Sequence, residues 1–176
     1  MIEYHLIQPR EIHTKRQRFR PLTTNDLDPL HQLWIHPQVR RYLWDDQIIP
    51  KEQTLSIIHQ SLDLFETEQF GLWAVFPHSE EMLAGFAGFW FFHDPPELQL
   101  IYGIHPNYWG QGWGTESAQV MIQYAFDFLD FNQVIASADA ANIASIRVME
   151  KAGMQLKKQV LIDGKETIYY QIFREP

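Results

Sequence analysis

The sequence predicts an α/β protein of the α+β kind, in which a mixed, mostly antiparallel central sheet of about seven strands is flanked by helices. Three observations support this class. Short β-prone runs alternate with amphipathic helical patterns. An Asp163-Gly164 hairpin signal separates two strand-like runs near the C-terminus. No repeat or linker interrupts the 176 residues, a length that suits one domain, so we treat residues 1–176 as a single domain.

The first part of the chain predicts one strand followed by helices. Residues 19–22 are typical of a strand, and Thr24-Asn25-Asp26 supplies capping residues for the helix that follows. Residues 27–34 then carry apolar side chains at the three- and four-residue spacing of an amphipathic helix. Pro37 and Pro50 each begin a further helix, because proline is well accommodated in a first helical turn.

The rest of the chain predicts further strands and two more helices. Gly85 and Gly88 lie inside one strand, where glycine marks a bulge or a close approach of two backbones. Gly153 supplies a C-terminal cap for a helix at residues 144–151. The strands expected after the third helix are 72–76, 82–92, 97–104, 134–138, 155–162 and 166–173.

The composition excludes several classes of protein. Hydrophobic residues make up 45% of the chain and aromatic residues 14%, which argues against disorder. The apolar runs are far shorter than the ~20 residues needed to cross a bilayer, and the opening Met-Ile-Glu-Tyr-His-Leu does not resemble a signal peptide. The absence of cysteine excludes disulfides, thiolate metal sites and an acetyl-cysteine intermediate. We therefore expect a cytoplasmic protein without a membrane partner.

The charge balance bears on the partners of the protein. The chain carries 22 acidic and 14 basic residues, a net charge of −8. A nucleic-acid-binding protein is usually basic, so we expect no nucleic-acid partner. An acidic surface instead favours a cationic acceptor such as an amine. The eight histidines show none of the paired spacings of a metal site, so we expect no metal, and the sequence leaves both a monomer and a homodimer open.

The most informative stretch runs from residue 100 to residue 118. It begins as an apolar, β-prone segment, passes His105-Pro106, and then places three glycines among five positions, Gly110, Gly112 and Gly114. A helical pattern of apolar residues follows. The first N–H groups of a helix have no internal partner, and glycines let a phosphate approach them without a Cβ in the way. The stretch therefore predicts a phosphate-binding turn between a strand and a helix.

Two common phosphate motifs do not fit this turn. A P-loop needs Lys and Ser or Thr after its second glycine, and the dinucleotide fingerprint needs G-x-G-x-x-G, whereas this turn has G-x-G-x-G. The turn instead resembles the acetyl-CoA signature of the GNAT N-acetyltransferases, a Q/R-x-x-G-x-G/A pattern. It appears here as Trp109-Gly-Gln-Gly112-Trp-Gly114, in which Trp109 departs from the usual Gln or Arg.

A second segment strengthens this resemblance. Residues 142–154, Asn-Ile-Ala-Ser-Ile-Arg-Val-Met-Glu-Lys-Ala-Gly-Met, are similar to the N-x-x-S-x-x-x-x-E-K-x-G-F segment of the RimJ/RimL-like (ribosomal-protein-alanine acetyltransferase-like) branch. Met154 stands in place of Phe. The resemblance runs from about residue 18 to residue 174 and implies one GNAT domain with the GNAT fold. The alternative is a glycine-rich loop with only a turn role.

The resemblance implies acetyl-CoA as the cofactor and a set of residues that hold it. The turn would bind the pyrophosphate, and the backbone of Ile104 and His105 would pair with the pantetheine arm and polarise the thioester carbonyl. Asn142 would contact the same arm, and Ser145 would lie near the sulfur. The turn residues assigned to the cofactor are Trp109, Gly110, Gln111, Gly112, Trp113, Gly114 and Thr115.

Two catalytic residues are expected, Ser145 and Glu97. Many GNAT enzymes donate a proton to the leaving thiolate from a Tyr at a position that holds Met149 here, so Ser145, or a water that it holds, is the expected substitute. Its alternative role is a helix N-terminal cap. The family often has a Glu base where this chain aligns Gln99. Glu97 lies two residues earlier on the same strand face and is expected to act through water, the alternative being a surface charge at the start of a strand.

These expectations define one function and one alternative. The expected function is that of an acetyl-CoA-dependent N-acetyltransferase, which moves the acetyl group to a primary amine by direct attack in a ternary complex. The acceptor would be a protein N-terminal α-amine or a small molecule, and the resemblance assigns the helices after Pro37 and Pro50 to its side. The alternative is a non-catalytic acyl-CoA-binding sensor or interaction domain with a GNAT-like fold.

Tyr102 shares a strand face with Leu100 and Ile104 and is expected to be a core residue.

Overall fold

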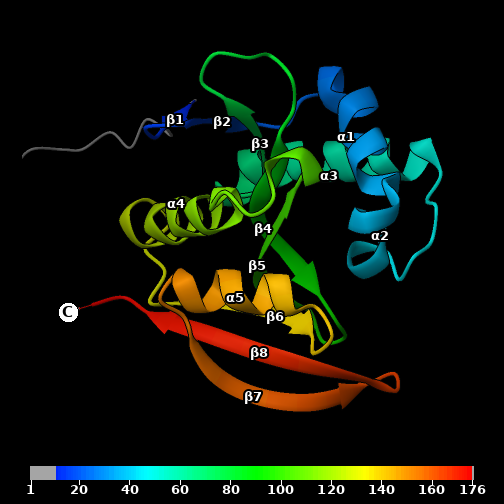
Figure 1. Cartoon of the computed structure of the whole chain (residues 1–176). Coiled ribbons are helices and arrows are strands. Elements are labelled where there is room, and N and C mark those ends of the chain that lie inside the picture. The colour runs from blue at the N-terminus through cyan, green and yellow to red at the C-terminus, as the bar shows by residue number, and fades with distance from the viewer. Residues whose placement is uncertain (1–10, 176) are drawn as a thin grey trace, which may run out of the picture.

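The structure is a computed structural model that describes residues 11–175, in which helices pack against two sheets (Figure 1). The predicted α/β class is confirmed, whereas the expectation for the first six residues lies outside the described part. The strands are β1 (Ile12–His13), β2 (Gln17–Pro21), β3 (Leu72–Pro77), β4 (Gly85–Phe92), β5 (Glu97–Ile104), β6 (Gln133–Asp139), β7 (Gln155–Ile162) and β8 (Lys165–Phe173). The helices are α1 (Leu27–Ile35), α2 (Pro37–Leu43), α3 (Lys51–Glu68), α4 (Trp113–Asp127) and α5 (Ile143–Lys151), with short 3-10 helices η1 (Thr24–Asp26) and η2 (Pro106–Tyr108).

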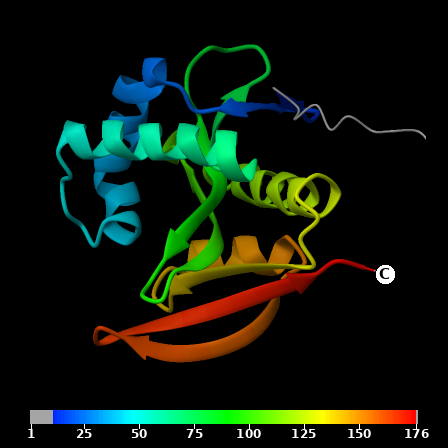
Figure 2. The same cartoon turned by 180° about the vertical axis from the view of Figure 1, so that it is seen from behind.

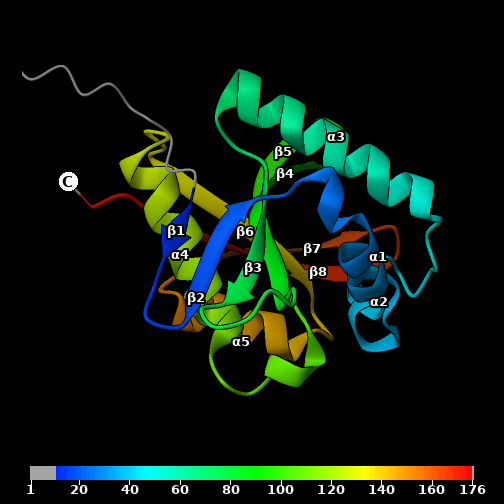
Figure 3. The ribbon, with the colours of Figure 1, turned by 90° about the horizontal axis from the view of Figure 1, so that it is seen from above.

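The larger sheet has the strand order β1-β2-β3-β4-β5, and each neighbouring pair is antiparallel. Figure 3 shows α1, α2 and α3 on one face of this sheet and α4 on the other. β3 is buried along its whole length, because its alternating side chains enter two separate cores. Leu72, Ala74 and Phe76 pack with α1 and α3, whereas Trp73 and Val75 join the core that α4 shares with the second sheet.

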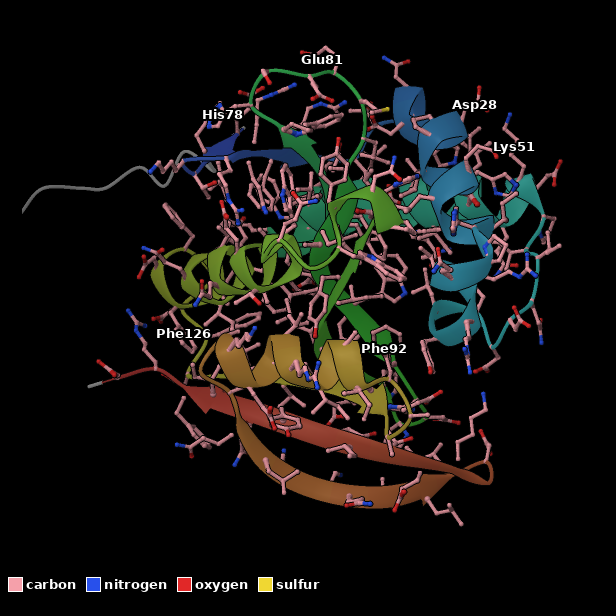
Figure 4. The ribbon with its side chains drawn as sticks, in the orientation of Figure 1. Asp28, Lys51, His78, Glu81, Phe92 and Phe126 are labelled. Atoms are coloured by element: carbon pink, nitrogen blue, oxygen red, sulfur yellow. The ribbon has the colours of Figure 1, made fainter. Side chains whose placement is uncertain are left out.

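Two ion pairs hold the helical layer in place, one by joining it to the sheet and one by joining two of its helices. Arg20 of β2 donates to both carboxylate oxygens of Asp26 at 2.7 and 2.8 Å, and Asp26 is only 4% exposed. Burial acts to raise the pKa of Asp26, but hydrogen bonds from Arg20 and Thr23 outweigh it and hold the pKa below its ordinary value. Lys51, at the start of α3, forms an ion pair with Asp28 of α1 (Figure 4). These contacts tie α1 to α3 and the segment before α1 to β2.

The smaller sheet has the order β6-β8-β7, is also antiparallel, and forms the lower part of the molecule in Figures 1 and 2. It follows β5 through α4, a helical crossover of the kind that joins parallel strands. Ser137 Oγ of β6 donates to Gln99 Oε1 of β5 at 2.6 Å. Further along both segments, Tyr102 of β5 contacts Ser145 of α5. The two contacts therefore show that β5 and the segment from β6 to α5 run side by side in the same direction. We call the line along which β5 faces β6 the sheet border.

Most predicted elements are present, with shifts at their ends. β7 and β8 flank Asp163-Gly164 as predicted, and Gly153 follows α5 with a φ of 92°. A Cβ on Gly88 would lie 2.1 Å from the carbonyl oxygen of Gly71, so the predicted close approach of two backbones is confirmed. The structure adds β1, which no sequence pattern indicated, and it begins β4 at Gly85, later than predicted. Within residues 11–175, no helix combines the length and the apolar character needed to cross a membrane.

Candidate functional site

The glycine turn between β5 and α4 leaves helix N–H groups open. Gly110 and Gly112 have φ values of 71° and 80°, a conformation that residues with a Cβ rarely adopt. Gly112 is the N-cap of α4, and Glu116 N–H donates to its carbonyl at 3.0 Å. The N–H groups of the residues between these two therefore precede the first internal bond of α4. They lie at the positive end of the helix dipole, which favours a bound anion.

Packing of two tryptophans supports the turn from both sides. The indole Nε1 of Trp109 donates to the Ile104 carbonyl at 2.7 Å, so this side chain folds back onto the end of β5 although it is 45% exposed. Trp113 is buried beneath the turn. Gly114 permits a close approach of α4 to α5, because even a Cβ at this position would lie 3.2 Å from a Val148 methyl group. The turn is therefore anchored by its side chains while its backbone is left for a ligand.

The end of β5 determines which backbone groups face the sheet border. His105 N–H donates to the Ala84 carbonyl at 2.7 Å and so belongs to the ladder with β4. Successive residues of a strand direct their backbone groups to opposite sides, so those of Ile104 point away from β4 and toward the sheet border. Of the two residues expected to pair with the pantetheine arm, Ile104 faces the border, whereas the N–H of His105 already has a partner.

Arg16, which sequence reasoning missed, lies just before β2 and contacts the turn. Its Nη1 donates to the Gln111 carbonyl at 2.8 Å, and its Nε and Nη2 donate to Glu116 Oε2 at 2.8 and 2.5 Å. Thr14 Oγ1 donates to the other carboxylate oxygen of Glu116 at 2.5 Å. One signal was available in the sequence, because no Lys or Arg occurs in residues 52–146. Any basic side chain at the turn therefore has to come from outside that long segment.

The first turn of α5 brings Ser145 against Tyr102. Asn142 is the N-cap of α5, since its Oδ1 accepts a hydrogen bond from Ser145 N–H at 3.2 Å. The alternative role of Ser145 as the helix cap is therefore wrong. Tyr102 packs against the core as expected, but its hydroxyl also donates to the Ser145 carbonyl at 3.0 Å and lies 2.9 Å from Ser145 Oγ. Burial raises the pKa of Tyr102 far above its ordinary value, so the phenol stays protonated.

Glu97 and Gln99 lie at the other end of β5. Gln99 is only 2% exposed, and its Nε2 donates to the Glu97 carboxylate at 2.8 Å while its Oε1 accepts from Ser137. The two side chains thus share a strand face, as predicted. Glu97 and Tyr102 are five positions apart, about 17 Å along a strand that rises ~3.3 Å per residue. The structure therefore does not bring Glu97 and Ser145 together.

Two histidines meet where α2 approaches the turn. His36 and His105 each precede a proline, and the Nδ1 of each accepts the N–H two residues further on, that of Gln38 at 3.3 Å and that of Asn107 at 3.2 Å. Their ring centroids are 5.7 Å apart in an edge arrangement. Burial, and then the charge of His36, lower the pKa of His105. His105 is therefore neutral near pH 7, with its proton on Nε2.

Of the two helices that the resemblance assigned to the acceptor side, α2 is joined to the far side of the sheet border. Tyr42 of α2 donates its hydroxyl hydrogen to the Ala141 carbonyl at 3.1 Å. Asp45, which follows α2, forms an ion pair with Lys165 at the start of β8. These two contacts join α2 and the loop after it to the segment before α5 and to the β7–β8 hairpin.

Other features of the described residues do not suggest a competing site. In this part of the chain, no group of three or more His, Asp or Glu side chains is placed to hold a metal ion. A recess of about 630 Å³ lies between α4 and the end of β8, and none of the predicted site residues lines it. The candidate site therefore consists of the glycine turn, the sheet border and the first turn of α5.

Known acetyltransferases resemble this chain in sequence and in fold. The sequence model of the acetyltransferase (GNAT) domain matches residues 16–155. The "uncharacterized N-acetyltransferase p20" of Bacillus licheniformis is 25% identical over 145 residues, which cover 82% of this chain and 82% of that protein. A solved acetyltransferase from Agrobacterium tumefaciens has a TM-score of 0.80 and 18% identity, covering 93% of this chain and 94% of its own. Solved RimL, a ribosomal L7/L12 alpha-N-protein acetyltransferase in complex with coenzyme A, has a TM-score of 0.78 and 17% identity over 93% and 97% of the two chains.

Proposed function

Because the chain belongs to the GNAT acetyltransferase family and is thus an acyltransferase, we propose that it transfers the acetyl group of acetyl-CoA to a primary amine. In this proposal the amine is a protein N-terminal α-amine or a small molecule, and it attacks directly in a ternary complex. The fold shared with RimL supports a place in the RimJ/RimL-like branch. The observation that carries the proposal is the turn at residues 110–115, where open helix N–H groups follow a strand at the sheet border.

The turn is proposed to hold the pyrophosphate of acetyl-CoA. Gly110 and Gly112 keep Cβ atoms out of the approach to the backbone, and the dipole of the 15-residue α4 favours the negative charge. Acetyl-CoA supplies the activated thioester when it is bound. The turn residues named above, from Trp109 to Thr115, contribute mainly their backbone and their packing to this site.

The pantetheine arm is proposed to follow the sheet border. Ile104 directs its backbone groups to that side, and its carbonyl oxygen has a second lone pair beyond the one that Trp109 uses. The Oδ1 of Asn142 caps α5, which leaves the Nδ2 of the same side chain to donate to an amide carbonyl of the arm. His105 contributes through its place in the β4–β5 ladder, which fixes the orientation of Ile104.

Ser145 is proposed to steady the leaving thiolate. When Tyr102 donates its hydroxyl hydrogen to Ser145 Oγ, the hydrogen of Ser145 is released to point at another acceptor. With acetyl-CoA bound, the Ser145 hydroxyl would donate a hydrogen bond to the sulfur as the carbon–sulfur bond breaks, and it would keep its own hydrogen, so that CoA leaves as a thiolate. Met149 is fully buried and has no hydrogen to donate, so it takes no part in this step.

The acceptor amine must also lose a proton. Gln99 cannot accept one, and the carboxylate of Glu97 lies far along β5 from Ser145. We therefore assign Glu97 only a weak, water-mediated role, with the proton leaving mainly to solvent. A cationic acceptor suits the negative charge near the loop after α2, where the hydrogen bond to Asp45 and the charges of Asp45, Asp139 and Asp163 raise the pKa of Lys165.

A panel of acceptors tests the proposed transfer. The protein is incubated with acetyl-CoA and either peptides that carry a free N-terminal amine or small primary amines, and both CoA thiol release and acceptor mass are measured. The proposal predicts amine-dependent thiol release and the addition of one acetyl group to the acceptor, and it predicts no product from the same peptides with a blocked N-terminus. Binding of acetyl-CoA without product from any acceptor would instead support a non-catalytic acyl-CoA-binding domain.

A further inference from the structure

The contact between Arg16 and the turn fixes the direction of one peptide group. The guanidinium Nη1 holds the Gln111 carbonyl at 2.8 Å. In a planar trans peptide, the carbonyl and the N–H of the next residue point to opposite sides. The N–H of Gly112 is therefore directed away from Arg16, to the other side of the turn.

This peptide needs a restraint from outside the turn. Gly112 has a φ of 80° and, lacking a Cβ, has access to a wide range of backbone conformations. Among the described residues other than Gly112 and its two chain neighbours, the only heavy atom within 4 Å of a Cβ built on Gly112 is Arg16 Nη2, at 3.6 Å. The packing around Gly112 thus offers little that would hold the peptide if Arg16 were removed.

Arg16 also controls the charge beside the turn. Glu116 lies in the first turn of α4, where its carboxylate would repel a phosphate held at the helix N-terminus. Two nitrogen atoms of Arg16 and the hydroxyl of Thr14 bind this carboxylate. The same guanidinium therefore neutralises Glu116 and holds the peptide before Gly112.

We infer that Arg16 is a positioning residue for the cofactor phosphates, which holds the Gln111–Gly112 peptide with its N–H toward the pyrophosphate and neutralises Glu116. It supplies the basic group that the turn itself lacks, since Trp109 stands at the first position of the motif and residues 52–146 contain no Lys or Arg. This inference rests on the proposed function, because it requires a phosphate-bearing ligand at the turn.

Binding measurements with two ligands test this role. Coenzyme A carries the pyrophosphate, whereas pantetheine has the same thiol arm without phosphate, and both are titrated calorimetrically into the wild type, Arg16→Gln and Arg18→Gln. Arg18 is the matched control, because it lies two residues further on and pairs with Glu81 instead of contacting the turn. Glu81 lies in the β3–β4 loop (Figure 4). Circular dichroism confirms that each variant is folded.

The role predicts a loss that depends on phosphate. Arg16→Gln should weaken coenzyme A binding about tenfold or more, the size expected for the loss of a charged hydrogen bond, and should leave pantetheine binding within about twofold. Arg18→Gln should change neither affinity by more than about twofold. Arg16→Lys should recover part of the loss, because an ammonium can still donate to the Gln111 carbonyl.

Three results would overturn the inference. Unchanged coenzyme A affinity in Arg16→Gln would show that the turn does not depend on Arg16. An equal loss for pantetheine would show that Arg16 only maintains the fold, and an Arg16→Lys variant as weak as Arg16→Gln would show that a positive charge at this position does not restore binding, which contradicts the neutralising role. Failure of the wild type to bind coenzyme A would instead contradict the proposed function. The experiment therefore distinguishes a failure of the proposed function from a failure of the role inferred for Arg16.

Discussion

The hydroxyl oxygen of Tyr102 lies 2.9 Å from Oγ of Ser145 and 3.0 Å from its carbonyl oxygen, so one side chain joins β5 to the first turn of α5. The phenol has a single hydrogen to share between these two acceptors. When that hydrogen goes to the Ser145 carbonyl, the serine hydroxyl is free to donate to Tyr102. When it goes to Oγ, the serine hydrogen is turned elsewhere, and the proposed reaction uses this second arrangement.

Substitution of these two residues should affect turnover more than cofactor binding. Ser145→Ala removes a donor to a developing negative charge, so kcat should fall by roughly 10²–10³, or about 2.7–4 kcal/mol of barrier. Tyr102→Phe leaves the serine in place without its partner, so its kcat should fall less, by about tenfold. Steady-state kinetics with one reactive amine, paired with coenzyme A titrations, measure both effects. Wild-type turnover in Ser145→Ala would remove Ser145 from the mechanism.

Glu97→Gln should have a small effect on the reaction. The carboxylate is bonded to Gln99 and lies far along β5 from Ser145, so the loss in kcat should be at most about tenfold, or ~1.4 kcal/mol. With no strongly placed base, kcat should rise with pH toward the pKa of the amine itself. The measurement is kcat against pH for the wild type and the variant. A thousandfold loss that also abolishes the acid limb would identify Glu97 as a direct general base.

The fold should lose stability as the solution becomes acidic, in part through His105. Burial and the neighbouring His36 lower the pKa of His105, so the unfolded chain binds this proton more readily than the folded chain. The corresponding stability is fully present above the ordinary histidine pKa of about 6.5 and is lost as the pH falls below it. Protonation of Nδ1 would also remove the acceptor of the Asn107 N–H bond.

His105→Asn tests this contribution, because an Asn oxygen can accept the same N–H bond without titrating in this range. Melting temperatures between pH 8 and pH 5 should fall less steeply for His105→Asn than for the wild type. His59→Asn, at an exposed position of α3, is the control and should follow the wild-type curve. If all three proteins showed the same slope, His105 would have no part in the acid sensitivity.

The sequence predicted the parts of the site that are local, and it missed those that depend on tertiary contacts. The glycine turn is visible because it is encoded within a few residues, whereas the capping role of Asn142 was not predicted and Ser145 was considered for it instead. Arg16 and Gln111 are 95 positions apart, and Tyr102 and Ser145 are 43 apart, so no short pattern links either pair. The role of the Tyr102 hydroxyl was missed because alternation along a strand indicates burial but not the hydrogen-bond partner of a buried group.

The position of Glu97 shows a second limit of sequence reasoning. Strand alternation correctly placed Glu97 on the face of Gln99, and their side chains are bonded. The same rule says nothing about distance from a residue on another element, and Ser145 is hydrogen-bonded to Tyr102, five positions along β5 from Glu97. The division into two sheets at the border between β5 and β6 is likewise a tertiary property, since each strand by itself has an ordinary strand pattern.

Titration of acetyl-CoA into the wild type and into Gly112→Val tests the central claim most directly. Chain neighbours apart, Arg16 is the only described residue near a Cβ at Gly112, so Val at this position acts through the strain of a positive φ and through its approach to the ligand. Gly164→Val in the β7–β8 hairpin is the matched control, because it imposes the same backbone strain at a φ of 78° far from the turn. The account predicts binding by the wild type and by Gly164→Val and no measurable binding by a folded Gly112→Val. Unchanged affinity in Gly112→Val would show that the turn does not hold the phosphates.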